Sequence, residues 1–300
     1  MRIIRFVNDK NTPALGAVTD EDKVYKLPYH SFLELVEQSK LLQKSPLDLI
    51  NTVLSEEEPL NRNVKELSLL VPIEAKEVWA SGVTYIRSKE ARNYEATGGN
   101  LDADTFYDKV YEADRPEIFF KSTVDRTIGT DEPVYLRSDS DWQIPEPELG
   151  LVLDADGSIL AYTIGNDMSC RDIEGENPLY LPQAKIWKNS CSIGPSIRLA
   201  ETVKDPYEFE IICRIYRNEN LVFEDSAKVS QLKRKLNELT DYLVKDNVVF
   251  PGTVLLTGTC IVPPNEFTLN DGDRVEIEIP GIGLLKNPVK SQVEHRSIVS

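Results

Sequence analysis

Hydrophobic and polar residues alternate in short runs near the N-terminus, and hydrophobic residues then recur at helical spacing. Three short runs predict β-strands: Ile3–Val7, Gly16–Val18 and Val24–Leu27. Two later stretches predict helices: Ser31–Ser39 and Leu47–Leu54. Ser31 and Ser45 suit the N-cap positions of these helices, and Pro46 falls at the favoured first helical position. We therefore predict a small α/β module over residues 1–70 and a larger domain over residues 71–300.

Beyond residue 70, short apolar runs are separated by Gly, Pro, Asn and Asp, which predicts an α+β fold that is mainly β. Two helical regions interrupt these predicted strands. The first covers Lys89 to Glu112 and is broken by Gly98-Gly99-Asn100. The second starts near Ser226 and carries one apolar stripe at helical spacing: Leu232, Leu236, Leu239 and Leu243.

The region from about residue 86 to 114 is charged, rich in Tyr and Glu, and carries a double glycine. These features are consistent with a mobile lid over a site. They are equally consistent with a solvated surface excursion, and composition alone does not choose between the two.

Acidic residues occupy positions where a buried strand is expected. Residues 148–153 have the apolar character of such a strand, and period-2 alternation sends Glu146 and Glu148 to the same face. The next apolar run, 159–164, leads to Asp167. A lone Glu-x-Glu is usually a solvated strand face. Three carboxylates that converge near a core, however, repel one another unless a cation holds them. Oxygen-only ligation points to Mg²⁺ first, then to Mn²⁺ or Ca²⁺.

The net charge of −16, from 34 basic and 50 acidic residues, argues against nucleic acid and anionic membranes as partners. No apolar run approaches the length that spans a bilayer, and charge interrupts the strand-like N-terminus, unlike in a signal peptide. Four cysteines are scattered without a Cys-x-x-Cys pair: Cys170, Cys191, Cys213 and Cys260. They fit small buried residues in a reducing compartment, so we expect a cytoplasmic protein.

A predicted strand that begins near residue 117 places charges beside an aromatic side chain. Alternation puts Glu117, Phe119 and Lys121 on one face. A Glu and a Lys that flank an aromatic residue are costly in a core and useful in a pocket. The alternative for Glu117 is a salt bridge to Arg115 or Lys121.

Several motifs, taken in order along the chain, resemble the fumarylacetoacetate hydrolase superfamily. They are Gly82–Tyr85, Phe119–Lys121, Glu146–Glu148, Gly165–Asp172, Lys185, Thr257–Thr259 and the closing segment Leu269–Gly283. The resemblance covers roughly residues 71–290. Three segments are more specific, and they resemble the superfamily's branch of 2-keto-3-deoxy-D-arabinonate dehydratases: 115–121, 137–142 and 176–186. The short N-terminal module is also similar to that branch.

The resemblance implies a mixed β-sandwich roll with a small N-terminal module and a helical lid, assembled as a homodimer or homotetramer. It implies a metal triad of Glu146, Glu148 and Asp167. The characteristic lysine of the family falls on Lys185, and the threonine for the substrate carboxylate falls on Thr259. Lys121 matches the lysine of the strand that leads into the pocket.

Two further residues are candidate substrate contacts. Gly258 lets the backbone N–H groups and hydroxyls of the segment 257–259 approach a carboxylate, although a plain strand-ending turn is the alternative. Gln183 lies in the loop that presents Lys185, where it could reach a substrate hydroxyl.

The chain departs from the family pattern at Ser88, which we include among the substrate-binding candidates. Hydrolytic members place a His three residues after the tyrosine that corresponds to Tyr85, and here Ser88 occupies that position. Only His30 and His295 exist elsewhere. A His-based hydrolase mechanism therefore has no obvious base, which favours chemistry that needs no activated water.

A metal-assisted β-elimination from a 2-keto-3-deoxy sugar acid fits this requirement, with 2-oxoglutarate semialdehyde and water as products. The metal polarises the ketone of such a 2-oxo acid and acidifies the C3 hydrogens. Lys185 is the first candidate base, because a lysine desolvated beside a cation has its pKa lowered. Glu117 is the candidate for proton delivery to the leaving hydroxyl, and the two roles can be exchanged. The alternative for Lys185 is an ion pair with a triad carboxylate.

Two other functions stay open at this point. One is another reaction on the same scaffold: acylpyruvate-type hydrolysis, oxaloacetate decarboxylation or tautomerisation. The other is a catalytically silent protein that binds 2-oxo acids.

Overall fold

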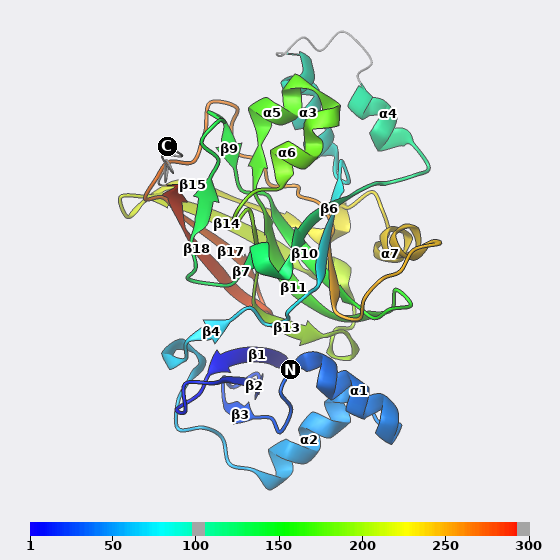
Figure 1. Cartoon of the computed structure of the whole chain (residues 1–300), viewed down its shortest axis with the longest axis vertical. Helices are drawn as coiled ribbons and strands as arrows, with labels where there is room; N and C mark the ends of the chain where they lie inside the picture. Colours follow the sequence, from blue (N-terminus) through cyan, green and yellow to red (C-terminus); the bar gives the residue numbers. More distant parts are fainter. Residues whose placement is uncertain (98–105, 293–300) are drawn as a thin grey trace, which may run out of the picture.

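The computed structural model describes residues 1–97 and 106–292 (Figure 1). Its first elements are three strands and two helices: β1 (Arg2–Val7), β2 (Pro13–Val18), β3 (Val24–Lys26), α1 (Phe32–Leu42) and α2 (Pro46–Glu56). The Ser31 side chain accepts a hydrogen bond from the Glu34 backbone N–H at the start of α1. Ser45 forms a capping box with Asp48 at the start of α2, where Pro46 is the first helical residue. The predicted strands, helices and N-caps of this region are confirmed.

The larger part of the chain alternates strands with short helices. Up to residue 153 it contains β4 (Leu69–Leu70), β5 (Glu77–Gly82), α3 (Ile86–Thr97), α4 (Phe106–Glu112), β6 (Glu117–Thr123), β7 (Thr127–Ile128), β8 (Val134–Leu136), β9 (Gln143–Ile144) and β10 (Pro147–Leu153). It continues with β11 (Ile159–Asp167), β12 (Ser169–Cys170), α5 (Arg171–Glu176), α6 (Leu181–Lys185), β13 (Cys191–Leu199), β14 (Glu210–Arg217), β15 (Asn220–Lys228), α7 (Leu236–Val244), β16 (Thr253–Leu256), β17 (Arg274–Ile279) and β18 (Gly283–Ser291).

Most strands belong to two packed sheets. The larger sheet has the order β3-β2-β1-β13-β11-β10-β16-β5-β6, with β4 beside β1 and β7 beside β13. The smaller sheet has the order β15-β14-β17-β18-β8. Strand β1 pairs antiparallel with β13, with Ile3 opposite Ile197, so the strands of the N-terminal module extend the sheet of the larger domain. The domain boundary at residue 70 stays a prediction.

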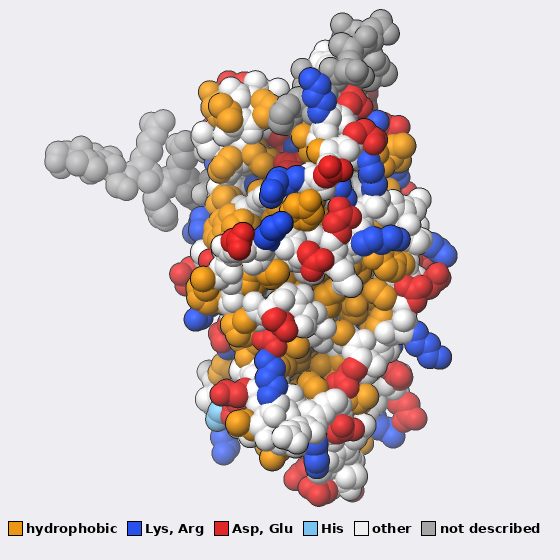
Figure 2. All heavy atoms as spheres, turned by 90° about the vertical axis from the view of Figure 1, so that its right-hand side faces the viewer, with side chains coloured by type: hydrophobic (Ala, Val, Ile, Leu, Met, Phe, Trp, Pro, Cys, Tyr) orange, Lys and Arg blue, Asp and Glu red, His pale blue; other side chains and the backbone are white. Residues whose placement is uncertain are grey.

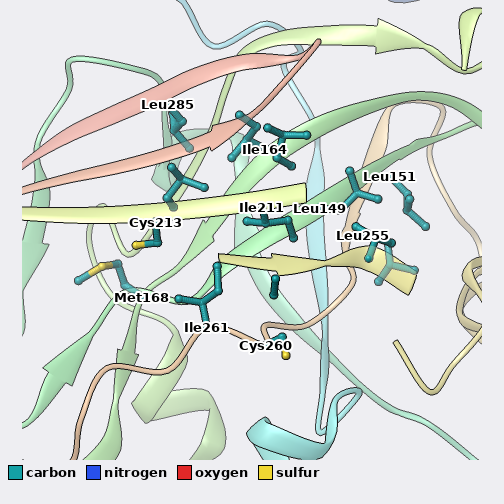
Figure 3. Close-up of a cluster of buried hydrophobic side chains, with 14 of the residues drawn as sticks. Leu149, Leu151, Ile164, Met168, Ile211, Cys213, Leu255, Cys260, Ile261 and Leu285 are labelled. Carbon is teal, nitrogen blue, oxygen red and sulfur yellow. The ribbon is translucent and has the colours of Figure 1, made fainter. Parts of the chain in front are cut away.

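The main hydrophobic core lies between these sheets (Figure 3). Its buried side chains come from both: Leu149, Leu151, Ile164, Leu255, Ile211, Cys213 and Leu285. The opposite face of β10 contributes Val152 to a second cluster that includes Ile3 and Phe32 of the N-terminal module. Because both faces of β10 are covered, its whole length is buried, including Glu148.

The structure corrects the predicted start of the second helical region. Ser226 lies in strand β15, where it pairs with Ile212 of β14, and helix α7 begins at Leu236. Leu232 is buried before the helix begins, so only the later leucines of the predicted stripe are helical. Exposed and half-buried residues alternate along much of β15, as expected for an edge strand. Because many of these residues are polar, the hydrophobic pattern of the sequence does not predict a strand here.

Helices α3 and α4 form the predicted lid region, and Figure 1 places α3 with α5 and α6 at the end of the molecule opposite the N-terminal module. The lid helices bury Arg92 and Tyr107, so they are more than a solvated excursion. The predicted break at 98–100 lies outside the described residues, and mobility of the lid stays a prediction.

Charged side chains of both signs are interspersed over the face shown in Figure 2, which includes the side of β6 and α7. No helix within residues 1–97 and 106–292 is long and apolar enough to cross a membrane.

Candidate active site

Three buried carboxylates converge at one end of β10 and β11. Glu148 lies in strand β10, and Glu146 immediately precedes that strand, two positions before Glu148. Asp167 is the last residue of β11. Antiparallel pairing puts Glu148 opposite Gly165, and the Asp167 backbone N–H donates to the Glu146 carbonyl over 3.0 Å. One oxygen from each carboxylate lies within 4.8 Å of the others. The predicted trio is therefore brought together by strand register, in a site from which water is largely excluded.

The trio fits a hard divalent cation. Burial and repulsion from Asp167 and Glu146 raise the pKa of Glu148 well above its ordinary value. One oxygen of Glu148 accepts from the Gly258 backbone N–H over 2.6 Å, and the other has no hydrogen-bond partner within the described parts of the chain. An all-oxygen donor set with a buried, unpartnered carboxylate oxygen is the set that Mg²⁺ favours. Glu146, Glu148 and Asp167 would hold such an ion.

Two buried lysines surround the trio. The Lys121 ammonium lies 2.5 Å from an Asp167 oxygen and donates to the carbonyl of Met168 over 2.9 Å and to the carbonyl of Lys185. The Lys185 ammonium lies 2.6 Å from Glu146 Oε2 and 3.4 Å from Asp167 Oδ2. Lys185 thus forms the ion pair that sequence reasoning kept as its alternative. All three donors of Lys121 are engaged within the protein, so its contact with substrate stays a prediction.

The expected lowering of the Lys185 pKa concerns a lysine beside a bound cation and stays a prediction, whereas the protein's own charges act in the opposite direction. Burial does oppose the charge on Lys185, but the carboxylates of Asp167, Glu146 and Glu174 outweigh burial and raise the pKa. The pKa of Asp167 is lowered for the converse reason, because Lys121 and Lys185 outweigh its burial. The lysine is therefore charged while it pairs with the trio.

Glu117 lies at the start of β6, opposite Gly82 of β5. A Cβ atom at Gly82 would lie 2.2 Å from Glu117 Oε2, so this glycine lets the carboxyl group pack against the backbone. That oxygen is buried without a hydrogen-bond partner among the described residues, and burial raises the pKa of Glu117. The alternative salt bridge is not formed, because Arg115 lies over the ring of Tyr242 and Lys121 binds Asp167.

A second buried charge pair, which sequence reasoning missed, joins helix α3 to helix α5. Arg92 of α3 forms an ion pair with Glu174 of α5, and both side chains are buried. The Ser169 hydroxyl donates to Glu174 over 2.9 Å. A polar helical region gives no sign of which arginine is buried, so only the fold reveals the pair.

The neighbouring residues Arg171 and Asp172 have different partners. Arg171 lies 3.3 Å from Glu146 Oε1, and its burial lowers its pKa to about 9. Asp172 accepts from the Ser140 hydroxyl over 2.6 Å and from the Asp141 backbone N–H over 2.7 Å. Arg171 therefore supports a carboxylate of the trio, whereas Asp172 fixes the loop that precedes β9.

The roles of the remaining candidate substrate contacts stay predictions. Ser88 donates to the Tyr85 carbonyl over 2.8 Å and accepts from the Tyr85 backbone N–H, so its hydroxyl closes a local turn. The Thr259 hydroxyl accepts from the Ile261 backbone N–H over 3.1 Å. Gln183 is exposed on α6. His30 is exposed in the N-terminal module, and position 295 lies outside the described residues.

Gly258 allows the chain to pass close to the trio. Its φ is +94°, and a Cβ there would lie 1.9 Å from Thr84 Oγ1. We expect Gly258→Ala to lower the free energy of unfolding by about 1–3 kcal/mol from backbone strain, and further through this contact. Gly272→Ala is the matched control, because its φ is +85° but nothing lies within 4 Å of the added Cβ. Equal losses for the two variants in urea denaturation would contradict this prediction.

Stability without metal should depend on pH in a defined direction. Burial raises the pKa of Glu148, Glu146 and Glu117 above the ordinary value of 4.5. Above that pH the folded protein therefore binds more protons than the unfolded chain, and its stability falls as pH rises through the raised pKa values. Cationic neighbours outweigh burial at Asp167 and Glu174 and lower the pKa of both residues. These two residues therefore change the stability of the protein only at lower pH.

We expect the thermal midpoint of the metal-free protein to decrease between about pH 5 and about pH 8. Magnesium at about 100 times its Kd should restore about 2.7 kcal/mol of stability, since it binds the folded state. Sodium chloride at matched ionic strength is the control. A metal-free midpoint that rises over this range would contradict the expectation.

The sequence of this protein matches the family described as fumarylacetoacetate (FAA) hydrolase C-terminal over residues 88–290. It is 45% identical over 229 residues to 2-dehydro-3-deoxy-D-arabinonate dehydratase of Saccharolobus solfataricus, which covers 76% of this chain and 76% of the relative. It is 48% identical over 219 residues to the probable 2-keto-3-deoxyxylonate dehydratase of Haloferax volcanii, which covers 73% of this chain and 74% of the relative.

A similar solved structure is 2-keto-3-deoxy-D-arabinonate dehydratase complexed with magnesium and 2,5-dioxopentanoate. It has a TM-score of 0.83 and 36% sequence identity, and the match covers 97% of this chain and 99% of that chain. These similarities confirm the fold class and the resemblance that the sequence motifs indicate. The chain belongs to the fumarylacetoacetate hydrolase family.

Proposed function

We propose that this protein is a magnesium-dependent hydro-lyase that converts 2-keto-3-deoxy-D-arabinonate into 2-oxoglutarate semialdehyde and water. The observation that carries the proposal is the buried trio of Glu146, Glu148 and Asp167, with Lys185 against it and Glu117 nearby. The named dehydratases at 45% and 48% identity support the same reaction. The related structure holds magnesium and 2,5-dioxopentanoate, which is the semialdehyde itself.

A divalent cation held by Glu146, Glu148 and Asp167 would act as a Lewis acid, which would polarise the 2-oxo group and make the C3 hydrogens acidic. Lys185 takes a proton from C3, and Glu117 delivers a proton to the hydroxyl that leaves C4. Loss of water leaves a C3=C4 double bond conjugated to the ketone. Transfer of a proton from C5 to C3 then gives the enol of the aldehyde, which takes a proton at C4 as it becomes the semialdehyde.

The surroundings of these two residues suit their roles. The pKa of Glu117 is raised by burial, so the carboxyl group holds a proton more readily than an exposed glutamate. Lys185 is charged while it pairs with Glu146 and Asp167, and it can act as a base only when a cation takes over these carboxylates. The exchanged assignment, with Glu117 as base, remains the second candidate.

The competing reactions have less support. Hydrolysis of a C–C bond needs a base for the attacking water, and His30 is exposed in the N-terminal module. Decarboxylation of oxaloacetate or its tautomerisation would use a dicarboxylate, for which the described residues offer no unpaired cation beside the trio. A silent 2-oxo-acid-binding protein would not need a buried carboxyl group such as Glu117, with its raised pKa.

The reaction is tested with purified protein, magnesium and 2-keto-3-deoxy-D-arabinonate, coupled to a 2-oxoglutarate semialdehyde dehydrogenase. We expect semialdehyde to form in equal amount to the sugar acid consumed, and EDTA to stop the reaction. Release of pyruvate or CO₂ from other 2-oxo acids would assign the protein to another reaction of the family. Tight magnesium-dependent binding without turnover would make it a sensor.

We also propose a cytoplasmic location and a homodimer or homotetramer. All four cysteines are free and buried, which supports a reducing compartment. Light scattering during size-exclusion chromatography measures the oligomeric state.

A further inference from the structure

A row of paired residues crosses four neighbouring strands of the larger sheet. Gly150 of β10 is opposite Leu256 of β16, which is opposite Ala80 of β5. Ala80 is in turn opposite Phe119 of β6. Directly opposite residues have their side chains on the same face of a sheet, and so do residues two positions apart along a strand. The face of this row is therefore also the face of the residues two positions further along each strand.

Two positions toward the end of the sheet that holds the trio, the same register leads to a glutamate, two glycines and a second glutamate. These residues are Glu148, Gly258, Gly82 and Glu117. Glu148 leans toward the segment after β16, because its Oε2 accepts from the Gly258 backbone N–H over 2.6 Å. Gly258 itself stays beside β5, since a Cβ atom there would lie 2.9 Å from the Ser81 carbonyl oxygen.

Glu117 leans over β5 from the other side. A Cβ atom at Gly82 would lie 2.5 Å from Glu117 Cδ and 3.0 Å from its Oε1, so the carboxyl group occupies the place of the missing side chain. The carboxyl groups of Glu148 and Glu117 thus lie over neighbouring segments, and neighbouring strands of a sheet are about 4.8 Å apart. Without this lean, the width of β5 would separate Glu117 from the trio.

Contacts of the adjacent residues on β6 connect the same face to the two lysines of the site. Alternation puts Glu117, Phe119 and Lys121 on one face of the strand. The Lys185 ammonium lies 5.7 Å from the centroid of the Phe119 ring, and the Lys121 ammonium binds Asp167. Glu117 therefore follows directly on this face beyond the residue that contacts the proposed base.

The position of Glu117, rather than the backbone, is what requires a glycine at residue 82. Gly82 does not have a positive φ, so alanine could adopt its backbone conformation without strain. The added methyl group would meet only the far end of the flexible Glu117 side chain at such short range. Rotation of that side chain away from β5 relieves the clash, so the fold should tolerate the change.

We propose that Gly82 is a positioning residue: because it lacks a side chain, the carboxyl group of Glu117 lies over β5, where it meets the C4 hydroxyl of a 2-oxo acid bound at the trio. The inference rests on the proposed function in that Glu117 serves this hydroxyl. It has a consequence for the substrate class. The site favours 2-oxo acids that carry a hydroxyl group at C4 over those that do not.

The first test compares the rates of dehydration of two glycine variants. Gly82→Ala should lower kcat by about 10²-fold, as expected when an acid is displaced by about 1 Å, and should leave the Kd of magnesium unchanged. Gly16→Ala is the matched control in β2 of the same sheet, where the added Cβ would lie 3.0 Å from the Phe6 ring. It should keep the native kcat. A native kcat in Gly82→Ala would overturn the proposal.

A double variant separates positioning from a structural role. In Glu117→Ala the carboxyl group is absent, so the further change Gly82→Ala has nothing to displace. The double variant should therefore have the same kcat as Glu117→Ala alone, a clear departure from additivity. A further decrease in kcat, or weaker magnesium binding, would show that residue 82 acts through the sheet and would overturn the proposal.

The second test uses ligands that cannot react. The compound 4-hydroxy-3,3-dimethyl-2-oxobutanoate has a C4 hydroxyl but no hydrogen at C3, and 3,3-dimethyl-2-oxobutanoate differs from it only by lacking the hydroxyl. Calorimetry with the full-length protein and magnesium gives the ratio of their Kd values. We expect the native protein to bind the hydroxylated ligand about fivefold more tightly, as one hydrogen bond gives. Gly82→Ala and Glu117→Ala should both lose this preference.

The ligand pair also distinguishes this inference from the proposed reaction. A preference that both variants lose, in a protein that does not dehydrate the sugar acid, would uphold the inference and refute the reaction. Dehydration without any preference for the hydroxylated ligand would overturn the inference and leave the reaction standing. A preference that persists in Gly82→Ala would overturn the inference as well. The native ratio alone decides the matter if Gly82→Ala does not fold.

Discussion

Glu148→Gln is expected to leave the fold intact and to abolish magnesium binding and turnover together. Glutamine has nearly the same shape, and its side-chain oxygen can still accept the hydrogen bond from the Gly258 backbone N–H. It cannot supply an anionic ligand for the cation. Loss of a metal that contributes several kcal/mol to the transition state corresponds to about a thousandfold or more in kcat.

The metal-free variant should be more stable than the metal-free native protein at neutral pH. Burial and the neighbouring carboxylates raise the pKa of Glu148, so its ionised form opposes folding there. We would measure magnesium affinity by calorimetry, thermal midpoints with and without metal, and turnover in the coupled assay. An active Glu148→Gln protein would show that the trio is not the metal site.

Glu77→Gln is a suitable control for Glu148→Gln. Glu77 begins β5, at the end of the strand away from Gly82, and accepts a hydrogen bond from the Trp79 indole over 3.0 Å. Glutamine preserves that bond while removing one charge from the same sheet. Magnesium binding and turnover of Glu77→Gln should therefore equal those of the native protein.

The trio could be predicted from sequence because it depends on local rules. Period-2 alternation places Glu146 and Glu148 on one face of a strand, and the short connection to the next strand brings Asp167 beside them. The helix N-caps at Ser31 and Ser45 depend on local rules in the same way, because each involves residues three positions apart.

Features that depend on distant packing could not be predicted. Arg92 and Glu174 lie 82 positions apart, and only the docking of α3 on α5 brings them into contact. The start of α7 was misplaced because β15 is an edge strand with polar residues, whose pairing with β14 is invisible without the fold. The pKa of Lys185 depends on burial against three carboxylates, and their balance follows from positions that the sequence does not give.

The second large effect is expected at Lys185. Lys185→Gln should lower kcat by about 10²–10⁴-fold, the usual contribution of a general acid or base. Magnesium affinity should be kept or increased. The lysine ammonium lies 2.6 Å from Glu146 Oε2 and 3.4 Å from Asp167 Oδ2, so it competes with a cation for both ligands. Without metal, the variant should lose about 3–5 kcal/mol of stability, because it leaves buried carboxylates without their partner.

Lys185→Arg separates the role of a base from that of a charge. Arginine keeps the positive charge beside Glu146 and Asp167, but it does not give up its proton in proteins. If Lys185 moves the C3 proton, Lys185→Arg should be as inactive as Lys185→Gln, while its metal-free stability lies closer to that of the native protein. A solvent isotope assay completes the test, because a true base exchanges the C3 hydrogens of substrate with deuterium from water. Activity and exchange that survive in Lys185→Arg would transfer the role of base to Glu117, whose buried carboxyl group is the remaining candidate.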